Sequence, residues 1–203
     1  MTTDELRQGP TEAERRLVLL HGWGADADDL LDLGKQLAGA EIELVALRAP
    51  EPHPLGVGRQ WYDLQEPEWP GLPKARDALR QRLLALSDSL PLERTVVLGF
   101  SQGAAMALDV ASGLPVAGLI ASSGYPHPGW APQTPLSRVL LTHGEQDPVV
   151  PVAASAEVLR LLRQGGGQAE LLRFAGGHTI DPTLFPALRD FLADRWKDPP
   201  GSP

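Results

Sequence analysis

Two kinds of apolar segment alternate along the sequence, and this alternation restricts the fold more than any other feature. Short runs rich in Leu and Val are typical of buried strands and occupy residues 17–20, 42–47, 95–98, 116–121, 139–142 and 169–174. Longer stretches with helical spacing of apolar residues lie between them, at residues 28–37, 74–86, 102–112, 153–163 and 183–196. Strands that alternate with helices indicate an α/β fold, a mostly parallel sheet with helices on both faces.

The chain is expected to form a single domain over residues 1–203. A chain of 203 residues can bury one sizeable core, and no repeat, low-complexity tract or linker divides it. We expect residues 1–14 and 197–203 to be flexible. Right-handed crossovers place the carboxyl ends of all parallel strands at one edge of the sheet, so a functional site is expected there.

Composition excludes several functions. The net charge of −8 argues against binding to nucleic acid or to an anionic membrane surface. The absence of cysteine rules out disulfides, thiolate metal sites and a cysteine nucleophile. No signal-peptide core, membrane-spanning run or His-Glu-x-x-His spacing occurs. These features favour a cytoplasmic protein and argue against a metal hydrolase.

A candidate nucleophile lies near the middle of the chain. Residues 95–105 read Thr-Val-Val-Leu-Gly-Phe-Ser-Gln-Gly-Ala-Ala, a strand that enters a tight turn and a helix that leaves it. This is the pattern of a nucleophile elbow, in which the Ser101 hydroxyl projects from the top of the sheet. Gly99 and Gly103 must be small because the two backbones pass close to each other. The alternative is an ordinary serine in a strand-to-helix turn, and the flanking strand and Ala-rich helix favour the elbow.

A serine hydroxyl needs an adjacent base that a third group orients, and the elbow fold places these in the order serine, acid, histidine. Asp147 follows the run at 139–142 and precedes a proline, which makes it the favoured acid, and Glu145 is the competing candidate. His178 follows two glycines after the last predicted strand, where a loop can hold a base over the sheet edge. We therefore predict Ser101 as nucleophile, His178 as base and Asp147 as the orienting acid.

Four other histidines could compete for the role of base. His21 and His143 each precede a glycine at a strand end and are expected to be hydrogen-bonded structural residues. His53 and His127 lie in proline-rich loops and are expected to be exposed. His178 alone follows both the serine and the acid in a suitable loop.

Two backbone amides are candidates for an oxyanion hole. In the elbow fold one donor is the amide of the residue after the nucleophile, here Gln102. The second comes from the loop after an earlier strand, here the turn His21-Gly22-Trp23-Gly24, and most plausibly from Trp23. The alternative is a plain turn before an acidic helix start.

The connection between residues 49 and 73 is long and rich in proline. Long ordered loops in compact domains are commonly functional, and this one follows a strand, so we expect it over the site edge. Trp23, Trp61, Trp69 and Trp130 all fall in loops after strands. Either they gather around one rim of the site, or they close the upper end of the core.

With these motifs in place, the sequence resembles the phospholipase/carboxylesterase family of α/β-hydrolases, which includes acyl-protein thioesterases and small bacterial carboxylesterases. The matching pieces follow the family order across nearly the whole chain. They are Leu20-His21-Gly22-Trp23-Gly24-Ala25-Asp26, Arg48-Ala49-Pro50, Gln60-Trp61-Tyr62-Asp63-Leu64, Gly99-Phe100-Ser101-Gln102-Gly103, Ser123-Gly124-Tyr125, His143-Gly144-Glu145-Gln146-Asp147-Pro148-Val149-Val150-Pro151 and Gly177-His178.

The resemblance implies hydrolysis of carboxylic esters or thioesters, including lysophospholipid-like substrates, through an acyl-enzyme and without cofactor or metal. It also implies that Trp61, together with Trp23, lines the substrate pocket. Ala104 stands where the family usually has glycine, and Trp23 stands where an aliphatic residue is common. The N-terminal segment is short for the full set of leading strands. These departures bear on substrate preference.

Two rival functions remain from the sequence. A dienelactone-hydrolase-like lactonase has the same order of residues but usually employs cysteine, which this chain lacks. A non-catalytic ligand-binding protein on a hydrolase fold generally loses one member of the triad, and here all three stand. The chain is too short for a large cap domain, so we expect an open site. An apolar rim around such a site could bind a small acyl substrate or form a homodimer interface.

Overall fold

The computed structural model describes residues 4–133 and 136–197. Within them the strands are β1 Glu5–Gln8, β2 Arg16–Leu20, β3 Glu43–Leu47, β4 Glu51–Pro52, β5 Arg59–Gln60, β6 Thr95–Phe100, β7 Gly118–Ser122, β8 Val139–Gly144 and β9 Ala169–Phe174. The α-helices are α1 Leu31–Ala38, α2 Leu72–Ala85, α3 Gln102–Val110, α4 Val152–Gln164 and α5 Phe185–Arg195. No helix of the described ranges is long and apolar enough to cross a membrane.

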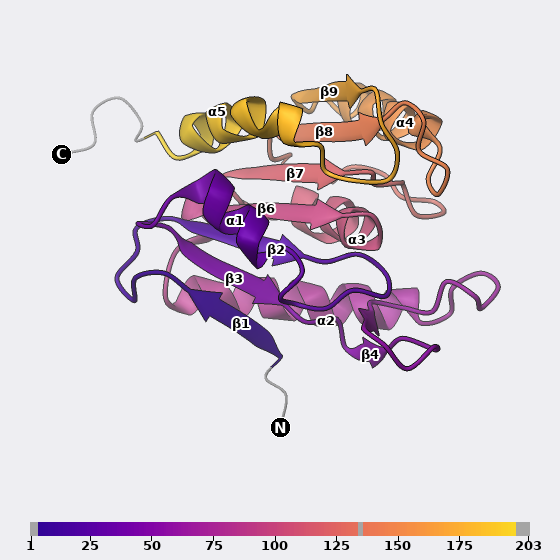
Figure 1. The fold of residues 1–203 in the computed structure, drawn as a ribbon, viewed down its shortest axis with the longest axis horizontal. Coiled ribbons are helices and arrows are strands. Elements are labelled where there is room, and N and C mark those ends of the chain that lie inside the picture. Colours follow the sequence, from indigo (N-terminus) through magenta and orange to yellow (C-terminus); the bar gives the residue numbers. More distant parts are fainter. Residues whose placement is uncertain (1–3, 134–135, 198–203) are drawn as a thin grey trace.

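The main sheet has the order β1-β3-β2-β6-β7-β8-β9, and Figure 1 shows its helices on both sides. Every pairing in this sheet is parallel except that of β1 with β3. The predicted α/β fold with a mostly parallel sheet is therefore confirmed. The register pairs Leu20 with Gly99, so the loops that follow β2 and β6 begin side by side.

Strand side chains alternate between two cores. Along β2, Val18 and Leu20 belong to the core that α2, α3 and α4 cover, whereas Leu17 and Leu19 belong to the core beneath α1 and α5. All four side chains are buried, which explains why the run reads as continuously apolar rather than alternating. Figure 1 shows α1 and α5 in front of the sheet.

The amino-terminal segment differs from the expectation of flexibility. Residues 5–8 form β1, an antiparallel edge strand on β3, and Arg7 Nη1 lies 2.9 Å from Glu43 Oε1 of that neighbour. The strand is short and mostly polar, so it has no apolar pattern that sequence could detect. Residues 1–3 and 198–203, which were also expected to be flexible, lie outside the described residues.

The proline-rich connection contains the two-stranded hairpin β4–β5 and lies against the turn after β2. The amide of Gly24 donates to the carbonyl of Arg59 (2.9 Å), and the amide of Arg59 donates to the carbonyl of Ala25 (2.7 Å). These bonds attach the connection to the edge of the sheet where the strands end, as the sequence predicted. Leu55 and Val57 at the hairpin tip are exposed.

Candidate active site

Ser101 stands at the junction of β6 and α3 in a strained backbone conformation, with φ 53° and ψ −118°. A positive φ is costly for a residue with a side chain and persists only where neighbours hold it. The amide of Ser101 donates to the carbonyl of Ser122 (2.9 Å), and its own carbonyl accepts from the amide of Ala105 (3.0 Å). The predicted strand, sharp turn and helix are therefore present.

The glycines on either side of Ser101 allow a close approach of backbones. A Cβ atom at Gly99 would lie 2.4 Å from the carbonyl oxygen of Gly103. One at Gly103 would lie 2.1 Å from the carbonyl oxygen of Leu20, in the neighbouring strand. Both distances are far below van der Waals contact and involve backbone atoms that cannot rotate away. The elbow therefore requires glycine at both positions.

Gly103→Ala should destabilise the protein by about 2–4 kcal/mol, because the new methyl group forces β2 and α3 apart. The measurement is the urea midpoint of unfolding, followed by circular dichroism. Gly113→Ala is the matched control, since its Cβ would meet nothing closer than the Gln133 side chain at 3.5 Å. Equal midpoints for the two variants would contradict the packing argument.

The structure brings the three predicted triad residues together at the carboxyl edge of the sheet. His178 Nε2 lies 2.9 Å from Ser101 Oγ, and His178 Nδ1 lies 2.7 Å from Asp147 Oδ2. Ser101 follows β6, Asp147 follows β8 and His178 follows β9. The rival acid, Glu145, is exposed, and its amide donates to the carbonyl of Phe174.

Gly144 allows the acid loop and the histidine loop to touch. A Cβ atom there would lie 2.2 Å from the carbonyl oxygen of Gly177 and 2.4 Å from that of Gly176. The amide of Gln146 also donates to the carbonyl of Gly176 (2.9 Å). Sequence reasoning treated Gly176 and Gly177 as flexible residues before the base. The structure shows that their backbone also packs against the loop that contains Asp147.

The Asp147 side chain is fully buried and saturated with hydrogen bonds. Its Oδ1 accepts the amides of Val149 (2.8 Å) and Val150 (2.9 Å). Burial alone would raise the pKa of this carboxyl, but the hydrogen bonds from His178 and the two amides outweigh it and bring the pKa below the ordinary value. Asp147 is therefore an anion at neutral pH, as an acid that orients a histidine must be.

The lowered pKa of Asp147 predicts an effect on acid stability. The pKa of this carboxyl is lower in the folded protein than in the unfolded chain. Such a carboxyl stabilises the fold when the pH lies above its unfolded pKa, and this stabilisation is lost as the pH falls through its folded pKa. Asp147→Asn should therefore lose less stability than the wild type when the pH is lowered from the unfolded pKa to the folded pKa of Asp147. Urea midpoints from pH 7 down to pH 3 test this, and parallel curves for the two proteins would contradict it.

His143 also contacts Asp147, at the same carboxylate oxygen as His178. It is completely buried, its Nε2 lies 2.8 Å from the Val150 carbonyl and 3.3 Å from Asp147 Oδ2, and its Nδ1 lies 2.7 Å from Ser155 Oγ. Because a carbonyl can only accept, we assign the proton to Nε2. The expectation of a hydrogen-bonded structural histidine is confirmed, and this residue holds the acid loop closed.

His21 connects the turns after two neighbouring strands. Its Nδ1 donates to the carbonyl of Gly22 (2.8 Å), and its Nε2 accepts the amide of Ala49 (3.1 Å). Burial, the largest influence on it, lowers the pKa of His21. The predicted structural role of His21 is therefore confirmed as well.

The expectation that His53 and His127 are exposed is wrong, because both are buried. His127 Nδ1 lies 2.6 Å from Asp109 Oδ2, and its Nε2 lies 2.9 Å from the Tyr62 hydroxyl. His53 packs edge-on against Trp23 with ring centroids 4.1 Å apart. The partners of both histidines are distant in sequence, so a proline-rich context gave a misleading indication of exposure.

The two predicted oxyanion donors flank the elbow. The amide of Gln102 is the first of α3 and has no acceptor within its helix. In the turn after β2, the amides of Gly24 and Ala25 donate to backbone carbonyls, and within the part of the chain that the structure describes the amide of Trp23 forms no such bond. A Cβ at Gly22 would lie 3.4 Å from Ser101 Cβ, so this turn packs directly on the elbow.

The Gln102 side chain has a task that sequence reasoning missed. Its Oε1 accepts the amide of Trp61 (3.0 Å), and its Nε2 donates to the carbonyl of Tyr62 (2.8 Å). It is completely buried. One residue thus presents its backbone amide at the elbow and binds the long connection with its side chain. The Gln in the Gly-Phe-Ser-Gln-Gly motif was the available signal.

Trp61, which the resemblance relates to the substrate pocket, is buried in the structure. Its side chain is 1% exposed, and its indole donates to the carbonyl of His21 (2.9 Å). The cavity it borders, of about 180 Å³, is lined by Arg48, Arg59 and Arg82 rather than by the triad. Its ring packs in the core and its indole nitrogen has a backbone partner there, and a role of Trp61 in the substrate pocket stays a prediction.

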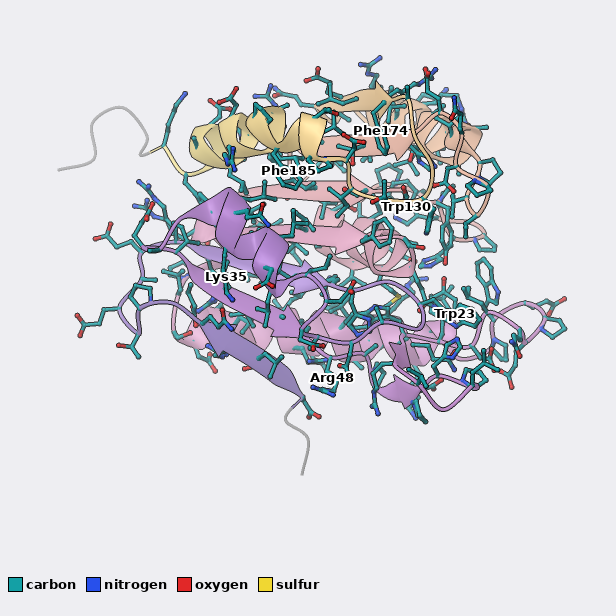
Figure 2. The ribbon with its side chains drawn as sticks, viewed as in Figure 1. Trp23, Lys35, Arg48, Trp130, Phe174 and Phe185 are labelled. Carbon is teal, nitrogen blue, oxygen red and sulfur yellow. The ribbon has the colours of Figure 1, made fainter. Side chains whose placement is uncertain are left out.

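The remaining tryptophans divide between the core and the sheet edge. Trp69 and Trp130 are partly buried and pack against the core beneath α2 and α3, which favours the expectation that they close the core. Trp23 lies at the edge where the strands end (Figure 2), and its indole donates to Gln60 Oε1 (2.8 Å). The proposed contact of Trp23 with substrate stays a prediction.

A mostly parallel sheet with a serine elbow after β6, an acid after β8 and a histidine after β9 defines an α/β-hydrolase. The sequence of residues 2–195 matches the phospholipase/carboxylesterase family. The chain belongs to this family. The resemblance noted from the motifs is therefore confirmed.

Relatives and solved structures agree with this placement. Acyl-protein thioesterase 1 of Neurospora crassa is 31% identical over 124 residues, which cover 54% of this chain and 49% of that protein, about half its length. Acyl-protein thioesterase 1 of Mycosarcoma maydis is 31% identical over 172 residues, 66% of this chain and 69% of that protein. The crystal structure of esterase PE8 superposes with a TM-score of 0.81 at 30% identity and covers 94% of this chain and 98% of its own.

Proposed function

We propose that this chain hydrolyses carboxylic esters or thioesters of small acyl substrates through Ser101 as nucleophile, His178 as general base and Asp147 as the group that orients it. One observation carries the proposal: an unbroken series of hydrogen bonds runs from Asp147 through His178 to a serine in a strained elbow. The names of the similar proteins, thioesterase and esterase, support the same reaction class.

The reaction begins with the proton on Ser101 Oγ. His178 Nε2 accepts this proton while Oγ bonds to the acyl carbon, and Asp147 stabilises the imidazolium through Nδ1. The carbonyl oxygen becomes an oxyanion that the amides of Gln102 and Trp23 stabilise. Collapse of this intermediate breaks the bond to the leaving group, which takes the proton from His178. Water then attacks the acyl-enzyme by the same steps and releases the acid.

Strain at Ser101 and the neighbouring helix serve this chemistry. The Ser101 hydroxyl lies 2.9 Å from His178 Nε2, and α3 begins at the next residue, Gln102. The first amides of that helix carry the positive end of its dipole, where a developing negative charge is stabilised. A single oxyanion donor is typically worth about a hundred- to a thousandfold in rate, so these amides are expected to contribute as much as the positioning of the base.

Covalent trapping tests the nucleophile directly. A fluorophosphonate reacts with an activated serine, and we expect one adduct, located by peptide mass spectrometry on the peptide that contains Ser101. Hydrolysis of p-nitrophenyl esters of increasing acyl length then gives the acyl preference. An adduct on another residue would overturn the assignment. A folded protein that forms no adduct and hydrolyses no ester would favour a non-catalytic binding function instead.

A further inference from the structure

A cavity with both apolar and polar walls lies beside His178, between the beginning of α1 and the beginning of α5. Its volume is about 320 Å³, at the lower end of the usual range for small-ligand sites. Figure 2 shows Phe185 at the start of α5, on the face of the sheet that α1 also covers. The apolar residues that line the cavity are Leu30, Leu33, Phe100, Ile180 and Phe185.

The position of this cavity relates it to one part of an ester. His178 Nε2 receives the Ser101 proton and must return it to the departing atom, which therefore lies within hydrogen-bond distance of that nitrogen. The oxyanion is directed instead toward the turn after β2. Phe100 packs on the His178 ring with centroids 4.9 Å apart and also lines the cavity, so its ring continues the wall from the base into the hollow.

We propose that this cavity receives the leaving group, and that the preferred leaving group is an uncharged, apolar alcohol or thiol. The inference rests on the proposed function, since it uses His178 as the acid that protonates the departing atom. It adds a substrate class to that function: the hydrolase binds the alcohol or thiol portion of its substrate on the face of the sheet that α1 and α5 cover.

The charge around the cavity argues against an anionic leaving group. Apart from His178, the one ionisable side chain among the described residues lining it is Asp29, which is negative. Neighbouring cations have partners of their own: Lys35 pairs with Asp32 at 2.9 Å, and Arg189 donates to the carbonyl of Gln36. Recognition of phosphate groups needs basic donors. A phosphorylated thiol such as coenzyme A is therefore disfavoured here.

A series of acetate esters tests the apolar character of the cavity. With the acyl group held constant, each methylene added to the alcohol, from methyl to hexyl, should raise kcat/KM by about two- to fourfold until the cavity is filled. S-benzyl thioacetate should likewise exceed acetyl-coenzyme A at least tenfold in kcat/KM. A flat alcohol series, or a preference for the coenzyme A ester, would overturn the inference.

A variant that fills the cavity tests whether the preference for long alcohol groups arises there. Leu33→Trp should lower the ratio of kcat/KM for hexyl acetate over methyl acetate about tenfold. Leu84→Trp, the same substitution at an exposed position of α2, should retain the wild-type ratio. An unchanged ratio in Leu33→Trp, or a change confined to the acyl-length preference, would assign the cavity to another part of the substrate and overturn the inference.

A binding measurement separates this inference from the proposed function. Saturation-transfer NMR with benzyl alcohol on Ser101→Ala protein should show contact, and the additional Leu33→Trp substitution should abolish it. Wild-type protein that hydrolyses no ester would contradict the proposed function. The NMR measurement would still show whether the cavity binds an apolar alcohol. Active enzyme that binds no benzyl alcohol in the Ser101→Ala form would overturn the cavity inference alone.

Discussion

Ser101→Ala is expected to reduce ester turnover by about 10⁴- to 10⁶-fold, because the alanine methyl group can neither attack the acyl carbon nor form an acyl-enzyme. The fold should persist, since among the described residues the hydroxyl hydrogen-bonds to His178 alone, and the substitution only replaces this hydroxyl with a hydrogen atom. Rates with p-nitrophenyl esters and the urea midpoint of unfolding, measured on the same preparation, separate loss of chemistry from loss of structure.

Ser123→Ala is the matched control for this prediction. Ser123 is also buried and also has a positive φ, 51°, but it follows β7 rather than β6. Its Oγ has no hydrogen-bond partner among the described residues. Turnover by this variant should stay within about twofold of the wild type. Substantial turnover by Ser101→Ala, or an equal loss in both variants, would contradict the assignment of Ser101 as nucleophile.

The fold and the convergence of the triad were predictable because each depends on local patterns. A buried parallel strand requires a continuous apolar run, and the runs at 95–98 and 139–142 became β6 and β8 with only their ends extended. Parallel strands end at one edge, so residues that follow three separate strands must meet there. The sequence therefore placed Ser101, Asp147 and His178 together without any knowledge of distances.

Two expectations that the structure corrects, the exposure of His53 and His127 and the flexibility of residues 5–8, share a physical cause, since the environment of each comes from distant parts of the chain. His127 is buried because Asp109 and Tyr62 provide its hydrogen bonds. Strand β1 exists because the open edge of β3 accepts it. The pattern of apolar and polar residues along the sequence does not indicate such distant partners.

The same reasoning explains why the cavity beside His178 was not predicted. Its walls come from the beginnings of two helices and from the residues around the serine and the histidine, which are more than a hundred residues apart in the chain at the extremes. Leu30 and Phe185 each read as ordinary positions on the apolar face of a helix. Only the packing of α1 beside α5 converts these faces into the walls of one hollow.

Asp147→Asn is expected to reduce kcat by about 10³- to 10⁴-fold while leaving the geometry largely intact. The carboxylate accepts from His178 Nδ1 with one oxygen and from the amides of Val149 and Val150 with the other. In an asparagine, the carbonyl oxygen keeps the two amides and the NH₂ group faces His178. Nδ1 must then accept, which leaves the proton on Nε2 and prevents that nitrogen from taking the proton of Ser101.

Glu145→Gln is the control, because Glu145 is exposed and lies two residues away in the same loop. It should retain activity within about twofold. The loss in Asp147→Asn should fall on kcat across the series of p-nitrophenyl esters, since the substrate makes no contact with a buried carboxylate that lies behind the histidine. If Glu145→Gln lost activity and Asp147→Asn kept it, the orienting acid would be Glu145, and the hydrogen bond at 2.7 Å to His178 would be structural only.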